Sequence, residues 1–268
     1  HGDVITFQDI AQDHPALAHQ YTFDGLDFFE RLQDNWGTAH LVEQAAGSAT
    51  VSNIGYGTPG FDESSEAATT YRPPPGGVEF SDGANFRIPS VTLGDEFSFE
   101  VIFRPSQETI SGGAFNLGYL LANRIGCDRG YFLFQGSAEL DEFGAFGTDG
   151  NDLASVIGSS FSVNNENTLL ENIQAGHWYY AAGSYRWENG NTTFINCVAD
   201  LTENQEKLTV IGPITVPGSY GRTAAGMSIG GRFDGPGEGF PGDIDEVNLY
   251  SEWLDEGEFE DHLLVLLE

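Results

Sequence analysis

The fold is decided by the stretch Gly239-Phe-Pro-Gly-Asp-Ile-Asp-Glu-Val-Asn-Leu-Tyr250, near the end of the 268-residue chain. From Gly242 onward polar and apolar residues recur with period two, which is typical of a β-strand. Strict alternation predicts two faces, one with Ile244, Glu246 and Asn248 and the other with Asp243, Asp245, Val247 and Leu249. An acidic side chain beside core residues needs a partner, because burying an unpaired charge is unfavourable. With only 10 Lys and Arg in the chain, a bound cation is the more available partner.

The composition around this stretch favours an all-β protein. The 20 Phe, 10 Tyr and 4 Trp are enough to fill a sizeable core, and the 35 Gly and 11 Pro suit short strands joined by turns. One β-sandwich commonly reaches this length. We therefore expect a single domain over residues 21–268, preceded by an arm or lead-in strand at 1–20.

The charge balance excludes some partners. Asp and Glu number 41 against 10 Lys and Arg, which gives a formal net charge of −31. Such a surface repels nucleic-acid phosphates and anionic lipid headgroups. The sequence has no apolar run of about 20 residues, so we do not expect it to insert into a membrane. The acidity favours divalent cations and solubility in salt, so a marine or halophilic extracellular setting is the expectation. The alternative is an acidic surface with no role in binding.

Further strand patterns precede the closing stretch in a fixed order. They are Tyr21-Thr-Phe-Asp-Gly25, residues 78–89 around an Asp82-Gly83 turn, residues 97–105, residues 178–186, residues 192–199 after an Asn189-Gly190 turn, and Met227-Ser-Ile-Gly-Gly231. A helical pattern at 251–264 follows. Residues 26–39 suit an inserted loop or short helix, and residues 53–77, which include Pro73-Pro-Pro75, suit a loop.

In sequence and order these stretches resemble the laminin-G-like, concanavalin-A-like jelly-roll family, whose closing strand reads close to G-x-I-D-E-V-x-I-Y. The resemblance runs from about residue 21 to 264. It implies a two-sheet antiparallel β-sandwich with a short C-terminal helix.

The resemblance also implies a calcium site. First and last strands are neighbours in a jelly roll, and related domains often hold a structural calcium there, so we expect Asp24, Asp243 and Asp245 to converge, with the Gly25 carbonyl as a further ligand. Calcium takes 6–8 oxygen ligands, mostly from carboxylates and carbonyls. The alternative is that Asp24 starts a turn while Asp243 and Asp245 face solvent.

Two acidic residues are weak catalytic candidates. Some enzymes of the resembled superfamily carry an E-x-D-x-E strand, and Glu139 and Asp141 share one side in Glu139-Leu-Asp-Glu142. Glu142 falls on the other side, so we expect a solvated acidic loop. His1-Gly2 resembles the opening of copper-dependent polysaccharide monooxygenases, and an arbitrary chain start explains it equally.

Aromatic residues in loops or at strand ends are the candidates for ligand binding. Sugar rings stack on Trp and Tyr, and recognition concentrates in loops. The candidates are Trp36, Tyr71, Trp187 and Tyr220. The predicted function is recognition of a polysaccharide or a glycoprotein glycan by a secreted or cell-surface domain with structural calcium. The alternatives are a secreted polysaccharide hydrolase or lyase and an adhesion or matrix protein.

Cys127 and Cys197 are the only cysteines. In a secreted β-domain two cysteines favour one disulfide, which stabilises a long loop by ~4 kcal/mol. Two free buried thiols are the alternative.

Overall fold

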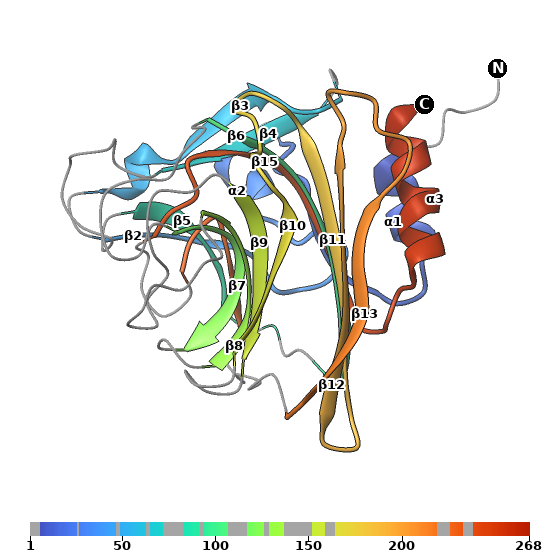
Figure 1. The fold of residues 1–268 in the computed structure, drawn as a ribbon. Helices are drawn as coiled ribbons and strands as arrows, with labels where there is room; N and C mark the ends of the chain where they lie inside the picture. Colours follow the sequence, from blue (N-terminus) through green and yellow to red (C-terminus); the bar gives the residue numbers. More distant parts are fainter. Residues whose placement is uncertain are drawn as a thin grey trace.

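The computed structural model describes residues 6–25, 27–46, 49–62, 65–71, 83–89, 91, 94–106, 117–125, 129–136, 152–158, 164–218, 226–232 and 238–268. Its strands form two antiparallel sheets packed face to face (Figure 1). Sheet A has eight strands in the order β13-β12-β11-β6-β15-β4-β3, with β1 also paired to β15. Sheet B has seven in the order β10-β9-β8-β7-β14-β5-β2. The predicted two-sheet β-sandwich is confirmed.

The strands of sheet A are β1 (Leu17–Tyr21), β3 (Gly55–Pro59), β4 (Glu66–Thr70), β6 (Glu96–Pro105), β11 (Tyr179–Glu188), β12 (Asn191–Asp200), β13 (Thr209–Pro217) and β15 (Gly242–Tyr250). Those of sheet B are β2 (Val42–Ala46), β5 (Gly83–Ile88), β7 (Leu117–Ile125), β8 (Arg129–Gly136), β9 (Asp152–Gly158), β10 (Asn164–Leu170) and β14 (Met227–Ile229). The helices are α1 (Phe7–Asp13), α2 (Phe28–Arg31) and α3 (Glu256–Leu267), with one 3₁₀ turn, η1 (Val51–Asn53).

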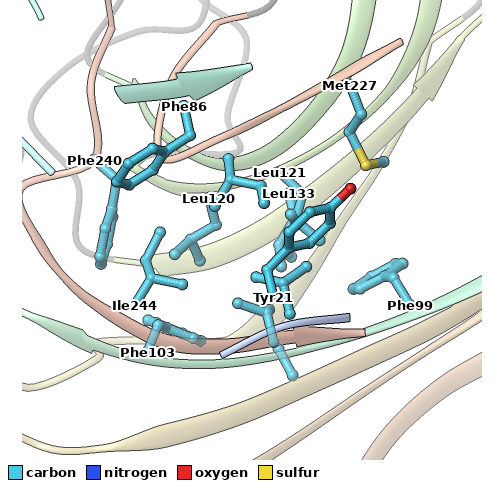
Figure 2. Packing of buried hydrophobic residues seen from close by; sticks show 14 of the residues in the cluster. Tyr21, Phe86, Phe99, Phe103, Leu120, Leu121, Leu133, Met227, Phe240 and Ile244 are labelled. Carbon is cyan, nitrogen blue, oxygen red and sulfur yellow. The ribbon is translucent and has the colours of Figure 1, made fainter. Parts of the chain in front are cut away.

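The main core lies between the two sheets. Alternate residues of each strand point inward, so β6 contributes Phe97, Phe99, Val101 and Phe103 to it. Figure 2 shows Phe99, Phe103 and Ile244 of sheet A in the same cluster as Phe86, Leu121 and Met227 of sheet B. Since burying a large apolar side chain stabilises the fold by about 1.5–3 kcal/mol, this layer is the main source of stability.

A second apolar cluster lies on the outer face of sheet A, where α1 and α3 cover the strands (Figure 1). Phe7 of α1 and Phe259 and Leu263 of α3 are buried there against residues such as Tyr180. The helix α3 starts at a capping box, in which Asp255 and Glu258 each accept the backbone N–H of the other. The middle strands of sheet A, β6, β11 and β15, are therefore covered on both faces.

The strand β15 corrects the predicted alternation. Its register on β6 shifts between Ile244 and Glu246, which makes Asp245 the extra residue of a β-bulge. After the bulge, Val247 and Leu249 stay in the main core with Ile244, while Asp245 and Glu246 both point to the outer face. The bulge thus removes the predicted conflict between carboxylates and core residues on one face.

Other predictions had mixed outcomes. The short helix in 26–39, the strand at 97–105 and the hairpin at Asn189-Gly190 are confirmed, and both turn residues have positive φ angles, 52° and 79°. The predicted loop at 53–77 was wrong in part, because this range contains β3 and β4. The small residues of these two strands do not give a clear alternation of polar and apolar side chains. The first strand is Leu17–Tyr21 rather than 21–25, and α3 starts at Glu256 rather than 251. Asp82 lies outside the described residues.

Candidate functional site

Two strands pair with the same edge of β15, one after the other, and the bulge lies between them. β4 pairs with residues from Gly242 to Ile244, and β1 pairs with residues from Val247 to Tyr250. The first and last strands of sheet A are therefore neighbours, as the family resemblance implied. Asp24 follows three residues after the end of β1, and Asp245 lies in the gap between β1 and β4.

A cavity of about 870 Å³ opens at this gap, between the outer face of sheet A, α1 and the end of α3. We call it the acidic pocket. Its acidic residues are Asp24, Asp62, Asp245, Glu246 and Glu268. Its apolar residues are Phe7, Phe61, Ile102, Val265 and Leu266. No Lys, Arg or His is among the described residues that line it, so its charge is negative and has no balancing cation in the lining.

Asp245 lines the acidic pocket and is 4% exposed. Its Oδ2 accepts hydrogen bonds from the Phe61 backbone N–H at 2.8 Å and the Ser65 hydroxyl at 3.0 Å. Gly60 makes this wrapping turn possible, because a Cβ there would lie 2.6 Å from both carboxylate oxygens. Burial, and then the charges of Asp24 and Asp62, raise the pKa of Asp245 to about 7 despite these hydrogen bonds.

Glu246 is 5% exposed and lies beside Asp245. Its Oε1 accepts a hydrogen bond of 3.1 Å from the Gln20 amide, whose own Oε1 accepts one of 2.8 Å from Gln12 of α1. Burial raises the pKa of Glu246 well above its ordinary value, and the neighbouring Asp245 charge adds to the shift. Burial therefore disfavours the charged form of Glu246.

The predicted metal ligands are only partly brought together. Asp24 lines the acidic pocket, but its oxygens accept the Glu66 backbone N–H at 2.6 Å and the Gln8 amide at 3.0 Å. Asp243 is instead held by two hydrogen bonds from Arg104, at 2.8 and 3.0 Å. Gly25 packs against α2, where a Cβ would lie 2.8 Å from that of Glu30.

Within the part of the chain that the structure describes, no group of three or more His, Cys, Asp or Glu side chains is arranged to hold a metal ion. The calcium site stays a prediction.

A buried polar network next to the pocket fastens α3 to sheet A. Glu100 of β6 is completely buried, and its Oε1 accepts hydrogen bonds from the Tyr180 hydroxyl at 2.5 Å and from His262 Nδ1 at 2.7 Å. Its Oε2 accepts from the Tyr250 hydroxyl and, at 3.4 Å, from the Asn248 amide. Burial alone would raise the pKa of Glu100, but the His262 charge and these hydrogen bonds outweigh it and lower the pKa. No local sequence pattern reveals this set, because its members are spread from residue 100 to 262.

Trp36 lies on a loop that a buried carboxylate orders. Asp34, 5% exposed, accepts the backbone N–H groups of Gln20, Trp36, Gly37 and Ala39, and its Oδ2 lies 2.6 Å from His19 Nδ1. Burial opposes ionisation, but these hydrogen bonds lower the pKa of Asp34 to about 2. A Cβ on Gly37 would lie 2.5 Å from Asp34 Oδ2, so the loop requires glycine there. The indole of Trp36 is 50% exposed on this loop.

The other predicted ligand-binding and catalytic residues differ from Trp36. Tyr71 and Trp187 are partly buried and pack against the main core. Tyr220, Glu139 and Asp141 lie outside the described residues. Among the predicted aromatic platforms that the structure describes, Trp36 is therefore the one with a half-exposed ring.

Cys197 is a buried free thiol, packed in the cluster under α1 and α3. Cys127 lies outside the described residues, between β7 and β8 of sheet B. Cys197 points to the face of sheet A that is turned away from sheet B, so the structure gives the predicted disulfide no support.

No protein-family model matches the chain, and no curated protein matches its sequence. Solved structures do match its fold. Domain 4 of AbnA, a GH43 extracellular arabinanase from Geobacillus stearothermophilus, in complex with arabinotriose, has a TM-score of 0.56 and 20% identity, over 92% of this chain and 98% of that domain.

Two botulinum neurotoxin structures are similar as well. The serotype D/C VPI 5993 binding domain has a TM-score of 0.57 and 10% identity, over 96% of this chain and 53% of that one. The DC binding domain in complex with rat synaptotagmin II has a TM-score of 0.55 and 10% identity, over 94% of this chain and 52% of that one. This chain spans about half the length of the toxin structures. Identities this low show a shared fold, on which one neighbour holds a sugar and another a protein.

Among the described helices, none has the length and apolar character needed to cross a membrane.

Proposed function

We propose that this chain binds a carbohydrate, such as a polysaccharide or a glycoprotein glycan, and that a sugar ring stacks on the indole of Trp36. The observation that carries the proposal is the half-exposed Trp36 ring on a loop held by four backbone hydrogen bonds to Asp34. An aromatic ring offers a sugar a flat apolar face, and a loop ordered beforehand loses little entropy when it binds.

The comparison with the arabinanase domain supports the proposal. That domain was solved with arabinotriose, and the likeness extends over nearly the full length of both chains. The complex of a similar toxin domain with synaptotagmin favours the adhesion alternative, in which the ligand is a protein. An extracellular location stays a prediction, as does the calcium.

The test is equilibrium binding of the full chain to a glycan panel that includes arabinotriose, arabinan and mammalian glycoprotein glycans. We expect saturable binding to at least one of them, weakened at least tenfold in Trp36→Ala, which corresponds to about 1.4 kcal/mol. The matched control is Leu264→Ala, which removes another exposed apolar side chain, 46% exposed on α3. Binding that Trp36→Ala leaves unchanged, or no binding to any glycan, would contradict the proposal.

A further inference from the structure

The acidic pocket is separate from the Trp36 loop, and glycan stacking at Trp36 makes no use of it. At about 870 Å³ its volume lies within the range of small-molecule sites. Pockets of that kind combine apolar walls with a few polar groups that fix orientation. In this pocket every charged side chain among the described lining residues is a carboxylate.

One carboxylate oxygen in this pocket has no hydrogen-bond donor among the described residues. Asp245 Oδ2 accepts two hydrogen bonds, whereas Oδ1 accepts none from the described residues, although the residue is only 4% exposed. A carboxylate oxygen that lines a cavity can accept a hydrogen bond from water or from a ligand there. Because Asp245 lines the pocket, a ligand in the pocket is placed to supply that donor.

The charge of the pocket favours a cationic donor. Asp24, Asp62 and Glu268 line the same cavity, so a negative or neutral ligand would leave their mutual repulsion unrelieved. A positive ligand would reduce it, and it would also favour the ionised form of Asp245, whose pKa these neighbours and burial raise to about 7.

The walls distinguish an organic cation from a metal ion. The cavity also has apolar surface, where a hydrated divalent ion has no ligands, from Phe7, Phe61, Ile102, Val265 and Leu266. Calcium needs 6–8 oxygens, and Asp24 already accepts hydrogen bonds at both of its oxygens. An ammonium group has three donors and needs far fewer acceptors, and an attached hydrocarbon body can contact the apolar wall.

We propose that the acidic pocket binds a small organic cation, a primary ammonium group on an apolar body, with Asp245 as its main anchor. The ammonium donates to Asp245 Oδ1, and Asp24 and Asp62 stabilise its charge from nearby. The body lies against Phe7 and Ile102. Apolar contact and charge pairing act together, so neither a neutral molecule of the same shape nor a bare metal ion is an equal substitute.

The test is isothermal titration calorimetry on the full, chelator-treated chain at pH 8 and fixed ionic strength, with 1-aminopentane as the probe. Its neutral match is 1-pentanol, and calcium chloride is a separate titration. We expect saturable binding of 1-aminopentane at least tenfold tighter than that of 1-pentanol. At pH 7 the complex should release protons, seen as a difference between buffers of unlike ionisation enthalpy.

Variants locate the site. Asp245→Asn should weaken 1-aminopentane binding at least tenfold, whereas Glu188→Gln, an exposed carboxylate on the β11–β12 hairpin, should not change it. Val265→Trp, which fills the pocket from α3, gives an independent test if Asp245→Asn does not fold. Equal binding of 1-pentanol, no loss in either pocket variant, or binding of calcium without 1-aminopentane would overturn the proposal. The last result would instead support the predicted calcium site.

Discussion

His262 Nδ1 lies 2.7 Å from Glu100 Oε1, and this pair joins the C-terminal helix α3 to the middle of sheet A. Glu100 is fully buried and His262 is 4% exposed, so neither charge can be compensated by solvent. The pair therefore fixes the position of α3, and with it one wall of the acidic pocket.

The charge of Glu100 should matter more than any one of its hydrogen bonds. Glu100→Gln leaves the His262 charge buried without its partner, and breaking a buried pair in this way costs about 3–5 kcal/mol. Tyr250→Phe is the matched control, because it removes one donor to Glu100 and should cost only about 1 kcal/mol. Urea unfolding at pH 6 measures both, and equal losses in the two variants would contradict the ion pair.

The same pair predicts a pH window. Glu100 has a lowered pKa in the folded state, so its contribution is present above its unfolded pKa of about 4.3 and is lost as the pH falls. The net effect on His262 is a raised pKa, because attraction to Glu100 outweighs burial, so its contribution is complete below about 6.5 and is lost as the pH rises through the folded pKa. The stability difference between wild type and His262→Phe should therefore be greatest between about pH 4.3 and 6.5. A difference that is constant from pH 4 to 9 would contradict the charged pair.

Asp245 should have the opposite effect on stability to an ordinary paired carboxylate. Its folded pKa of about 7 exceeds the unfolded value, so the folded state loses stability as the pH rises from about 4 to 7. Asp245→Asn should match wild type near pH 4 and be more stable at pH 8, by on the order of 4 kcal/mol for a shift of this size. Thermal unfolding across pH, with Glu188→Gln as control, measures this. A variant less stable than wild type at pH 8 would show that the carboxylate charge is already compensated.

The loop that holds Trp36 should depend on Asp34. Asp34→Ala leaves several backbone N–H groups without an acceptor, at about 1–3 kcal/mol for each one that stays buried. The loop should then lose order, which hydrogen exchange of the Trp36 and Gly37 amides would report. Because the folded pKa of Asp34 is about 2, its contribution should persist above pH 4 and be lost only as the pH falls toward 2. Slow exchange of both amides in Asp34→Ala would contradict this.

Much of the sandwich was predictable from local patterns. The alternation in β6 predicts a strand, and Asn189-Gly190 predicts a tight turn. Both predictions depend only on neighbouring residues, because period-two burial and positive φ angles are local constraints. β10 was not predicted, since its run Asn164-Asn-Glu-Asn-Thr-Leu-Leu170 is mostly polar. β13 was missed because glycine and two prolines interrupt it.

The site was less predictable than the fold. Neighbouring first and last strands placed Asp24 and Asp245 at one pocket, but the bulge at Asp245 depends on pairing with β6, which no local pattern reveals. The capture of Asp243 by Arg104 has the same cause, because it joins β15 to a strand distant in sequence.

Stacking of a glycan on Trp36 can be measured by ¹⁹F NMR of protein labelled with 5-fluorotryptophan. The chain has 4 Trp, so the Trp36 resonance is identified as the one missing from the spectrum of Trp36→Phe. Titration with a glycan that binds should shift this resonance saturably and leave those of Trp178, Trp187 and Trp253 nearly unchanged. A glycan that binds without moving the Trp36 resonance would contradict stacking on this ring.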